Sequence, residues 1–363
     1  MNTQKKSNID WIDIAKGTCI LLVVFHHIIS TNYIIPLDSV GNLESIVRKI
    51  YLHIGHYFTP LRMPLFFMIS GFLAQRSAKN ASWSSIWHKR INNIWYLYLL
   101  WGVIQCVSVG FIGWMSYREI AHPITNAIYS ENFSQFFNLT LTGRSSLWYL
   151  YALPIYFILC KTFANQKLIL IAIALSVNLA IRAFPIIWPI DSIIANAIYY
   201  IAGCFILPKL LPLLETESKK ILIYTIMSIA VILVLKILGI HIDVLNSLTM
   251  TAAFMLFFDY ISTKGDFTIL KWLGKNTLQI YVLHRILLEY INVFVTSHMF
   301  TPHNHHLTLW QQVLYITFPI IGTLLVAFIT LFIWKLTNVG IGKYLYKAPE
   351  WNAQKLKAVR DSK

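Results

Sequence analysis

Long apolar stretches separated by short polar segments dominate this chain of 363 residues. Runs of about 18–25 mainly apolar residues have the length that an α-helix needs to cross a bilayer. We therefore predict an all-α, polytopic membrane protein of about ten transmembrane helices, with the segment 45–58 as a partly embedded approach to the second. The predicted spans are 10–30, 58–75, 91–114, 146–163, 168–184, 193–213, 221–239, 244–262, 273–295 and 309–336.

Composition and charge agree with a membrane protein and give its orientation. Apolar residues make up 57% of the chain and charged residues 12%, against about 25% charged in soluble domains. With an even number of spans both termini share one side, and most lysines and arginines outside the spans fall on that side. Positive residues favour the cytoplasm, so both termini are predicted to be cytoplasmic. The net charge of +15 is thus explained by the bilayer, and no nucleic-acid partner is expected.

The chain is predicted to contain one membrane domain, 1–342, and a basic cytoplasmic tail, 343–363. The tail either lies on anionic headgroups or is a solvated end. All four cysteines fall inside predicted spans, which indicates packed thiols without a disulfide framework. Four histidines crowd the last outer loop without a cysteine or acid beside them, so no metal site is expected. These histidines are His298, His303, His305 and His306.

The first span contains a charge and a histidine that share a helix face. Lys16 and His27 are eleven residues apart, which returns to within about 20° of one direction and separates them by roughly 16 Å. Ionisable groups at such depth are costly and usually functional. The alternative is a snorkelling lysine and a packed histidine. His26 is rotated by about 100° from His27, so His27 is the preferred candidate.

Two further polar groups interrupt the apolar pattern. Arg62 precedes the second span and is either an anchor at the outer interface or an anion contact in a cavity. In the ninth span Arg285 and Glu289 are four residues apart and can neutralise each other. They form either a structural ion pair or, through Glu289, a partner for a catalytic histidine such as His284 or His27.

These residue types suit acyl transfer from a nucleotide-bearing thioester. A hydroxyl acceptor must lose a proton, and histidine is the usual base near neutral pH; it can also carry the acyl group covalently. The phosphates of the donor favour lysine and arginine. Lys16 toward the cytoplasm and His27 deeper in the membrane fit a donor that enters from the cytoplasm.

Several segments resemble the integral membrane acyltransferase 3 family. The spacing of Lys16 and His27, with ten residues between them, is similar to the basic-x10-His signature of that family. The segments 63–72 (MPLFFMISGF), 147–150 (LWYL), 200–203 (YIAG) and 273–281 (LGKNTLQIY), the last leading to His284, match further motifs in the same order. The resemblance covers roughly residues 8–338.

The resemblance implies a multi-pass enzyme of the bacterial inner membrane that transfers groups other than amino-acyl groups. It implies a cytoplasmic acyl-CoA, usually acetyl-CoA, as co-substrate without a bound cofactor, and a hydroxyl of a cell-envelope glycan or lipid-linked sugar as acceptor. The predicted roles are catalytic for His27, Glu289 and His284, donor-binding for Lys16, Arg90 and Arg62, and acceptor or cavity lining for Ser70, Trp148 and Arg285.

The chain also departs from the family pattern. The basic residue of the signature, Lys16 in this chain, is more often arginine in the family. Lysine lacks the guanidinium group that can make two parallel hydrogen bonds to a phosphate. A second arginine and a proline after Arg90 are replaced by Asn93 and Leu97. No fused periplasmic domain is present, so a periplasmic partner protein would have to supply that role unless the acceptor is simple.

A carrier of an acylated sugar or another organic anion is the alternative function. Lys16, Arg62, Glu289 and the histidines would then line an aqueous path. Carriers often show internal symmetry and matched broken helices, and we detect neither in the sequence. This favours the enzyme.

Overall fold

The computed structural model describes residues 4–32, 42–116, 125–216, 243–296 and 307–349, with scattered residues between 223 and 238 and residue 299. The described residues are helical and contain no strand, which confirms the predicted fold class. The elements are α1 Gln4–His27, η1 Ile28–Asn32, α2 Asn42–Tyr57, α3 Thr59–Asn80, α4 Trp83–Ile86, η3 Trp87–Asn92, α5 Asn93–Ser116, η4 Ala127–Tyr129, α6 Phe133–Leu141, α7 Trp148–Thr162, η5 Ala164–Gln166, α8 Lys167–Ala183, α9 Ile190–Phe205, α10 Leu207–Thr216, α12 Asp243–Ser262, α13 Thr268–Lys275, α14 Thr277–Tyr290, η6 Ile291–Thr296, α16 Leu309–Thr337 and η7 Gly340–Leu345.

Seven helical segments among the described residues are long and apolar enough to cross a membrane. They are Asp10–Asn32, Glu44–Asn80, Trp83–Ser116, Ala164–Ala183, Asp243–Ser262, Thr277–Thr296 and Leu309–Thr337. Two other predicted spans correspond to the shorter helices α7 and α9, and most of the predicted span 221–239 lies outside the described residues. The count of about ten and the cytoplasmic placement of both termini stay predictions.

Two helix crossings are so close that only glycine fits. A Cβ added to Gly274 of α13 would lie 1.8 Å from the Asp13 carbonyl oxygen of α1, and one added to Gly17 would lie 2.1 Å from that of Leu270. The crossing of α3 and α9 is built in the same way by Gly71 and Gly203, whose added Cβ atoms would lie 2.0 and 1.9 Å from backbone oxygens. Small residues let helix backbones approach in this manner.

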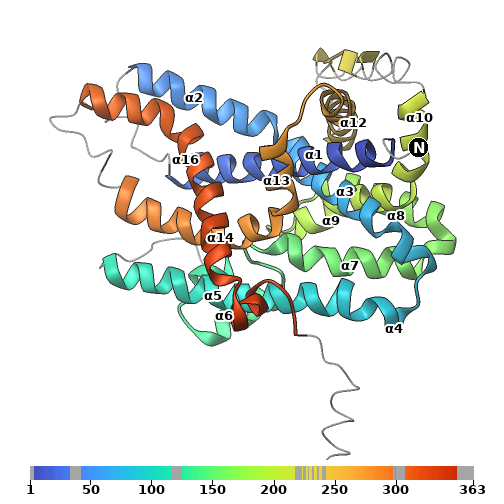
Figure 1. Cartoon of the computed structure of the whole chain (residues 1–363), viewed down its shortest axis with the longest axis horizontal. Helices are drawn as coiled ribbons and strands as arrows, with labels where there is room; N and C mark the ends of the chain where they lie inside the picture. The colour runs from blue at the N-terminus through green and yellow to red at the C-terminus, as the bar shows by residue number, and fades with distance from the viewer. Residues whose placement is uncertain are drawn as a thin grey trace, which may run out of the picture.

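Helix α1 runs through the bundle and contacts α3, α12, α13, α14 and α16 (Figure 1). Its last residue, His27, is followed by the π-helical turn η1, and α14 continues in the same way into η6. Such turns are rare and frequently occur at functional sites. The Asn32 side chain donates to the Leu288 carbonyl oxygen at 3.0 Å and so ties the ends of these two helices together.

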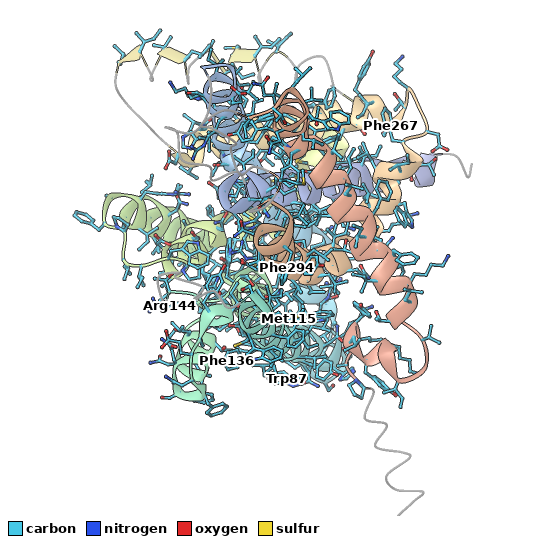
Figure 2. The ribbon with its side chains drawn as sticks, turned by 90° about the vertical axis from the view of Figure 1, so that its left-hand side faces the viewer. Trp87, Met115, Phe136, Arg144, Phe267 and Phe294 are labelled. Atoms are coloured by element: carbon cyan, nitrogen blue, oxygen red, sulfur yellow. The ribbon has the colours of Figure 1, made fainter. Side chains whose placement is uncertain are left out.

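The connection between α5 and α7 folds back along one flank of the molecule, where Phe136 of α6 and Arg144 lie (Figure 2). Within it, the Ala127 amide donates to the Arg144 carbonyl oxygen at 2.8 Å. Asn126 caps the short turn η4 by accepting from the Ile128 amide at 3.3 Å. These bonds fix η4 against the bundle and bring its last residue, Tyr129, to α14.

The segment after α16 also packs against the bundle. Tyr96 and Trp101 of α5 donate to the carbonyl oxygens of Tyr344 at 2.9 Å and Leu345 at 2.6 Å. The domain boundary that we predicted at 342 therefore falls within a packed segment, and the described residues continue to 349. The remainder of the predicted basic tail lies outside the described residues.

Candidate active site

Two histidines from different helices face each other near the end of α1. The ring centroids of His27 and His284 are 5.4 Å apart, and those of His26 and His27 are 5.5 Å apart. Arg285 follows His284 directly on α14 and is also buried. The pair thus joins α1 to α14, although the two histidines are 257 positions apart in the sequence.

The orientation of His284 is set by its own helix. Its Nδ1 lies 2.7 Å from the Tyr281 carbonyl oxygen and 3.1 Å from that of Ile280. A carbonyl oxygen can only accept, so Nδ1 carries the proton and the lone pair of the neutral ring is on Nε2. The Nε2 atom is buried and has no hydrogen-bond partner among the described residues. Its lone pair is therefore not engaged by any described residue.

A buried polar cluster lies one turn farther along α14. Arg285 Nη2 is 2.6 Å from Glu289 Oε1, which establishes the ion pair expected from their spacing. The Tyr129 hydroxyl donates to Glu289 Oε1 at 2.5 Å and accepts from Arg285 Nη2. Arg285 Nη1 donates to the Thr31 hydroxyl at 3.1 Å. The pair is thereby connected to η1, directly after His27.

Tyr129 is held as a neutral hydrogen-bond donor. Burial raises the pKa of its phenol above the usual value, and the Glu289 charge raises it further, while Arg285 opposes both effects. A protonated phenol can donate to the carboxylate and accept from the guanidinium at the same time. Among the described residues, Glu289 thus bonds to Arg285 and Tyr129 and to neither histidine.

A cavity of about 230 Å³ lies between α1, α3, α5, α7 and α14. Lys16, Ile20 and Val23 form its α1 wall, and His27 continues this row by one more helical turn. Most of the remaining wall is aliphatic or aromatic. It consists of Met63, Phe66, Ile69, Ser70, Leu73, Asn93, Ile94, Leu97, Tyr149, Leu150, Leu153, Thr277, Leu278 and Tyr281.

Three of the hydroxyl groups on the cavity wall make hydrogen bonds to one another or to the backbone. Ser70 Oγ and the Tyr149 hydroxyl are 2.7 Å apart. The Tyr281 hydroxyl accepts from the Tyr149 amide at 3.3 Å and donates to the Ser146 carbonyl oxygen at 2.9 Å. Tyr281 also binds Nδ1 of His284 through its carbonyl oxygen, so the cavity wall and the histidine pair share one residue.

Comparison with known proteins identifies the family of the chain. A family model described as an acyltransferase domain matches residues 9–332. The chain belongs to this acyltransferase family. The inner membrane protein YcfT of Escherichia coli (strain K12) is 30% identical over 295 residues, which cover 80% of this chain and 82% of that protein. No solved structure matches. The chain is accordingly a membrane acyltransferase, and the predicted inner-membrane location is confirmed.

The structure of this acyltransferase places the predicted donor residues in three environments. Lys16 lines the cavity and forms an ion pair with Asp13 at 3.3 Å. Arg90 Nη2 donates to the carbonyl oxygen of Leu73, a cavity residue, at 2.9 Å. Arg62 is buried and donates to the Thr59 hydroxyl at 3.0 Å, and it does not line the cavity.

The predicted acceptor residues of the acyltransferase also separate. Ser70 lines the cavity, whereas Arg285 belongs to the cluster beyond the histidines. Trp148 packs against Phe67 with ring centroids 5.8 Å apart, and its neighbour Tyr149 forms the cavity wall. The two positions at which the chain departs from the family pattern, Asn93 and Leu97, both line the cavity.

Sequence reasoning missed several residues of the site. Tyr129 lies in a connection without helical periodicity, and no sequence signal linked it to α14. Tyr149 and Tyr281 lie inside two of the recognised motifs. The motifs indicated the helix on which each tyrosine lies, but they did not indicate that the two tyrosines contact each other. The predicted loop histidines, from His298 to His306, lie outside the described residues.

Proposed function

We propose that this protein transfers an acyl group, with acetyl as the expected group, from cytoplasmic acyl-CoA to a hydroxyl of a cell-envelope glycan or lipid-linked sugar. The single observation that carries the proposal is the His27–His284 pair. His27 lies at the end of the row of α1 residues that begins with Lys16 on the cavity wall. The hydroxyl acceptor requires a base whose nitrogen has a lone pair that is not engaged. The thioester donor is suited by an apolar cavity that contains one lysine.

In the proposed reaction a histidine is the general base. Its nitrogen accepts the proton of the acceptor hydroxyl while the hydroxyl oxygen attacks the thioester carbonyl carbon. The tetrahedral intermediate collapses, the carbon–sulfur bond breaks, and the coenzyme A thiolate takes up the proton held by the histidine. If His27 carries the acyl group itself, its nitrogen first displaces the coenzyme A thiolate to form an acyl-histidine. The acceptor oxygen then displaces that nitrogen, so that the carbon–nitrogen bond breaks and the hydroxyl proton passes to the thiolate.

The remaining polar residues have supporting roles in this proposal. Lys16 binds the charged part of the donor. Arg285, fixed by Glu289 and Tyr129, stands beside the histidine pair, where its charge stabilises the oxyanion that develops during attack. No cofactor is needed, because the activated donor supplies the free energy of the transfer.

The test is thioester consumption by the purified chain in detergent with an extract of envelope glycans and lipid-linked sugars as acceptor, and release of free coenzyme A is the readout. A carrier of acylated sugars would show no turnover, which would overturn the proposal. Mass spectrometry of envelope glycans from cells with and without the protein then identifies the acceptor as the species that loses its acyl mass.

A further inference from the structure

A second hollow, of about 400 Å³, lies between the start of α14, the end of α16 and the segment after it. Its wall includes Gln279, Trp334, Lys343, Tyr344, Tyr346 and Lys347. We propose that this cleft binds the 3′-phosphorylated ADP portion of the acyl-CoA donor. The inference rests on the proposed function, because it assigns a second subsite to the same donor.

The side chains of the cleft suit a phosphorylated adenosine. Lys343 and Lys347 supply two positive charges for phosphate groups. Trp334 and Tyr344 supply aromatic surface, on which a purine base stacks favourably; Tyr346 is buried against Trp101 and supports the cleft from below. A lipid headgroup would use the lysines but would gain nothing from the two rings.

One buried acceptor in the cleft lacks a partner. Gln279 Oε1 is enclosed and makes no hydrogen bond to any described residue. Buried polar atoms are nearly always satisfied, and a side-chain amide is the group that pairs with the amino group of adenine. The adenine amino group would therefore satisfy Gln279.

Hydrogen bonds to neighbouring helices hold the walls of the cleft in place. The carbonyl oxygens of Tyr344 and Leu345 are bound by Tyr96 and Trp101 of α5, and η7 contacts α5 at the lower side of the view (Figure 1). The Tyr346 hydroxyl is 2.7 Å from the Thr337 hydroxyl oxygen. A site fixed in this way loses little conformational entropy on binding.

The cleft adjoins the apolar cavity, as one donor molecule requires. Asn93 lines the cavity, and its Oδ1 accepts from the amide of Ala348, a cleft residue, at 2.7 Å. Leu278 lines the cavity and the next residue, Gln279, lines the cleft. With the nucleotide in the cleft, the pantetheine arm and the acyl group would extend into the cavity. All the cleft residues except Gln279 lie beyond residue 332, where the family match ends.

The experiment measures binding of coenzyme A, dephospho-coenzyme A and pantetheine to the purified full chain by titration calorimetry in detergent. Wild type is expected to bind coenzyme A most tightly. Lys343→Ala with Lys347→Ala should weaken coenzyme A binding about 10- to 100-fold and remove the preference over dephospho-coenzyme A. Lys343→Arg with Lys347→Arg should restore most of the affinity.

Lys335→Ala is the matched control, because Lys335 is an exposed lysine of α16 that does not line the cleft. An equal loss of coenzyme A affinity in this control overturns the nucleotide site, and so does an unchanged affinity in the cleft variants. Either outcome leaves the proposed function intact. Loss of dihexanoyl phosphatidylglycerol binding alone assigns the cleft to lipid headgroups and also overturns it. If wild type neither binds coenzyme A nor consumes acyl-CoA, the proposed function itself fails.

Discussion

His27 and His284 stand 5.4 Å apart, ring centroid to ring centroid, at the junction of α1 and α14. His284 is fixed by two carbonyl oxygens of its own helix, whereas His27 ends its helix at the π-helical turn η1. One ring is thus held rigidly and the other lies at a local irregularity of the backbone. This difference fits a division between a positioned base and a group that meets the substrate.

Replacing either histidine should stop the transfer. His27→Ala and His284→Ala are each expected to lower thioester turnover by about 10²–10⁴-fold, the usual contribution of a general base. His26→Ala should be milder, because His26 is turned away from the row that lines the cavity. Turnover of purified variants checks this, with the gel-filtration profile as control for folding. Wild-type rates in His27→Ala would remove His27 from the mechanism.

The Arg285–Glu289 pair allows structural and functional roles to be separated. Arg285→Met alone leaves a buried carboxylate without its partner, which typically costs about 3–5 kcal/mol of stability. Arg285→Met with Glu289→Gln should restore most of that stability, because no lone charge remains. We expect this double variant to insert and fold but to have little activity, since the charge beside the histidines is lost.

Thermal unfolding in detergent and thioester turnover, measured on the same preparations, test this expectation. Tyr129→Phe is the companion variant, because it removes only the hydroxyl that joins Arg285 to Glu289. Near-normal turnover in the double variant would reduce the pair to a structural one.

Lys16 should affect the donor and not the acceptor. Lys16→Ala is expected to raise the KM for acyl-CoA by about tenfold or more, because a hydrogen bond to a charged group contributes about 1.5–3 kcal/mol. Lys16→Arg keeps the charge and should be tolerated. Initial rates over a matrix of both substrate concentrations separate the two constants. A change confined to the acceptor KM would show that the assignment is wrong.

The glycine crossing of α1 and α13 should be intolerant of a single methyl group. Gly274→Ala would place its Cβ against the Asp13 carbonyl oxygen, and overpacking of this kind costs about 1–3 kcal/mol or more. The displacement should also move Lys16, three residues along α1, and so raise the donor KM. Gly110→Ala is the control, since nothing lies within 4 Å of its added Cβ. Equal melting temperatures for the two variants would refute the tight crossing.

Periodicity explains what could be predicted of the site. Lys16, Ile20, Val23 and His27 follow helical spacing, so one continuous helix necessarily places them in a row. Arg285 and Glu289 are related in the same way, and their ion pair follows from a spacing of four. Helical spacing is a local property, and it sufficed for the row on α1 and for the Arg285–Glu289 pair.

Contacts between distant segments could not be derived in this way. Tyr129 reaches Glu289 across 160 positions, and that contact depends on how the α5–α7 connection folds back. Trp148 and Tyr149 are adjacent in one motif, but neighbouring helical positions differ by about 100° in direction. The motif alone did not decide which of the two rings faces the cavity.

The predicted basic tail illustrates a similar limit. Its lysines dominated the sequence pattern, and they indicated only that the segment lies near phosphate or water. The bonds from Tyr96 and Trp101 go to backbone carbonyl oxygens, which every residue possesses. Residue identity therefore gave no sign that this stretch docks on α5.

The mainly aliphatic and aromatic wall of the 230 Å³ cavity also bears on unproductive hydrolysis of the donor. Water binds poorly where few polar groups can hold it, and the hydroxyl groups of Ser70, Tyr149 and Tyr281 are already engaged with one another or with the backbone. A thioester bound there would be shielded from hydrolysis for as long as no acceptor hydroxyl is present. The cell would then keep a loaded transferase at the membrane without draining its supply of activated acyl groups.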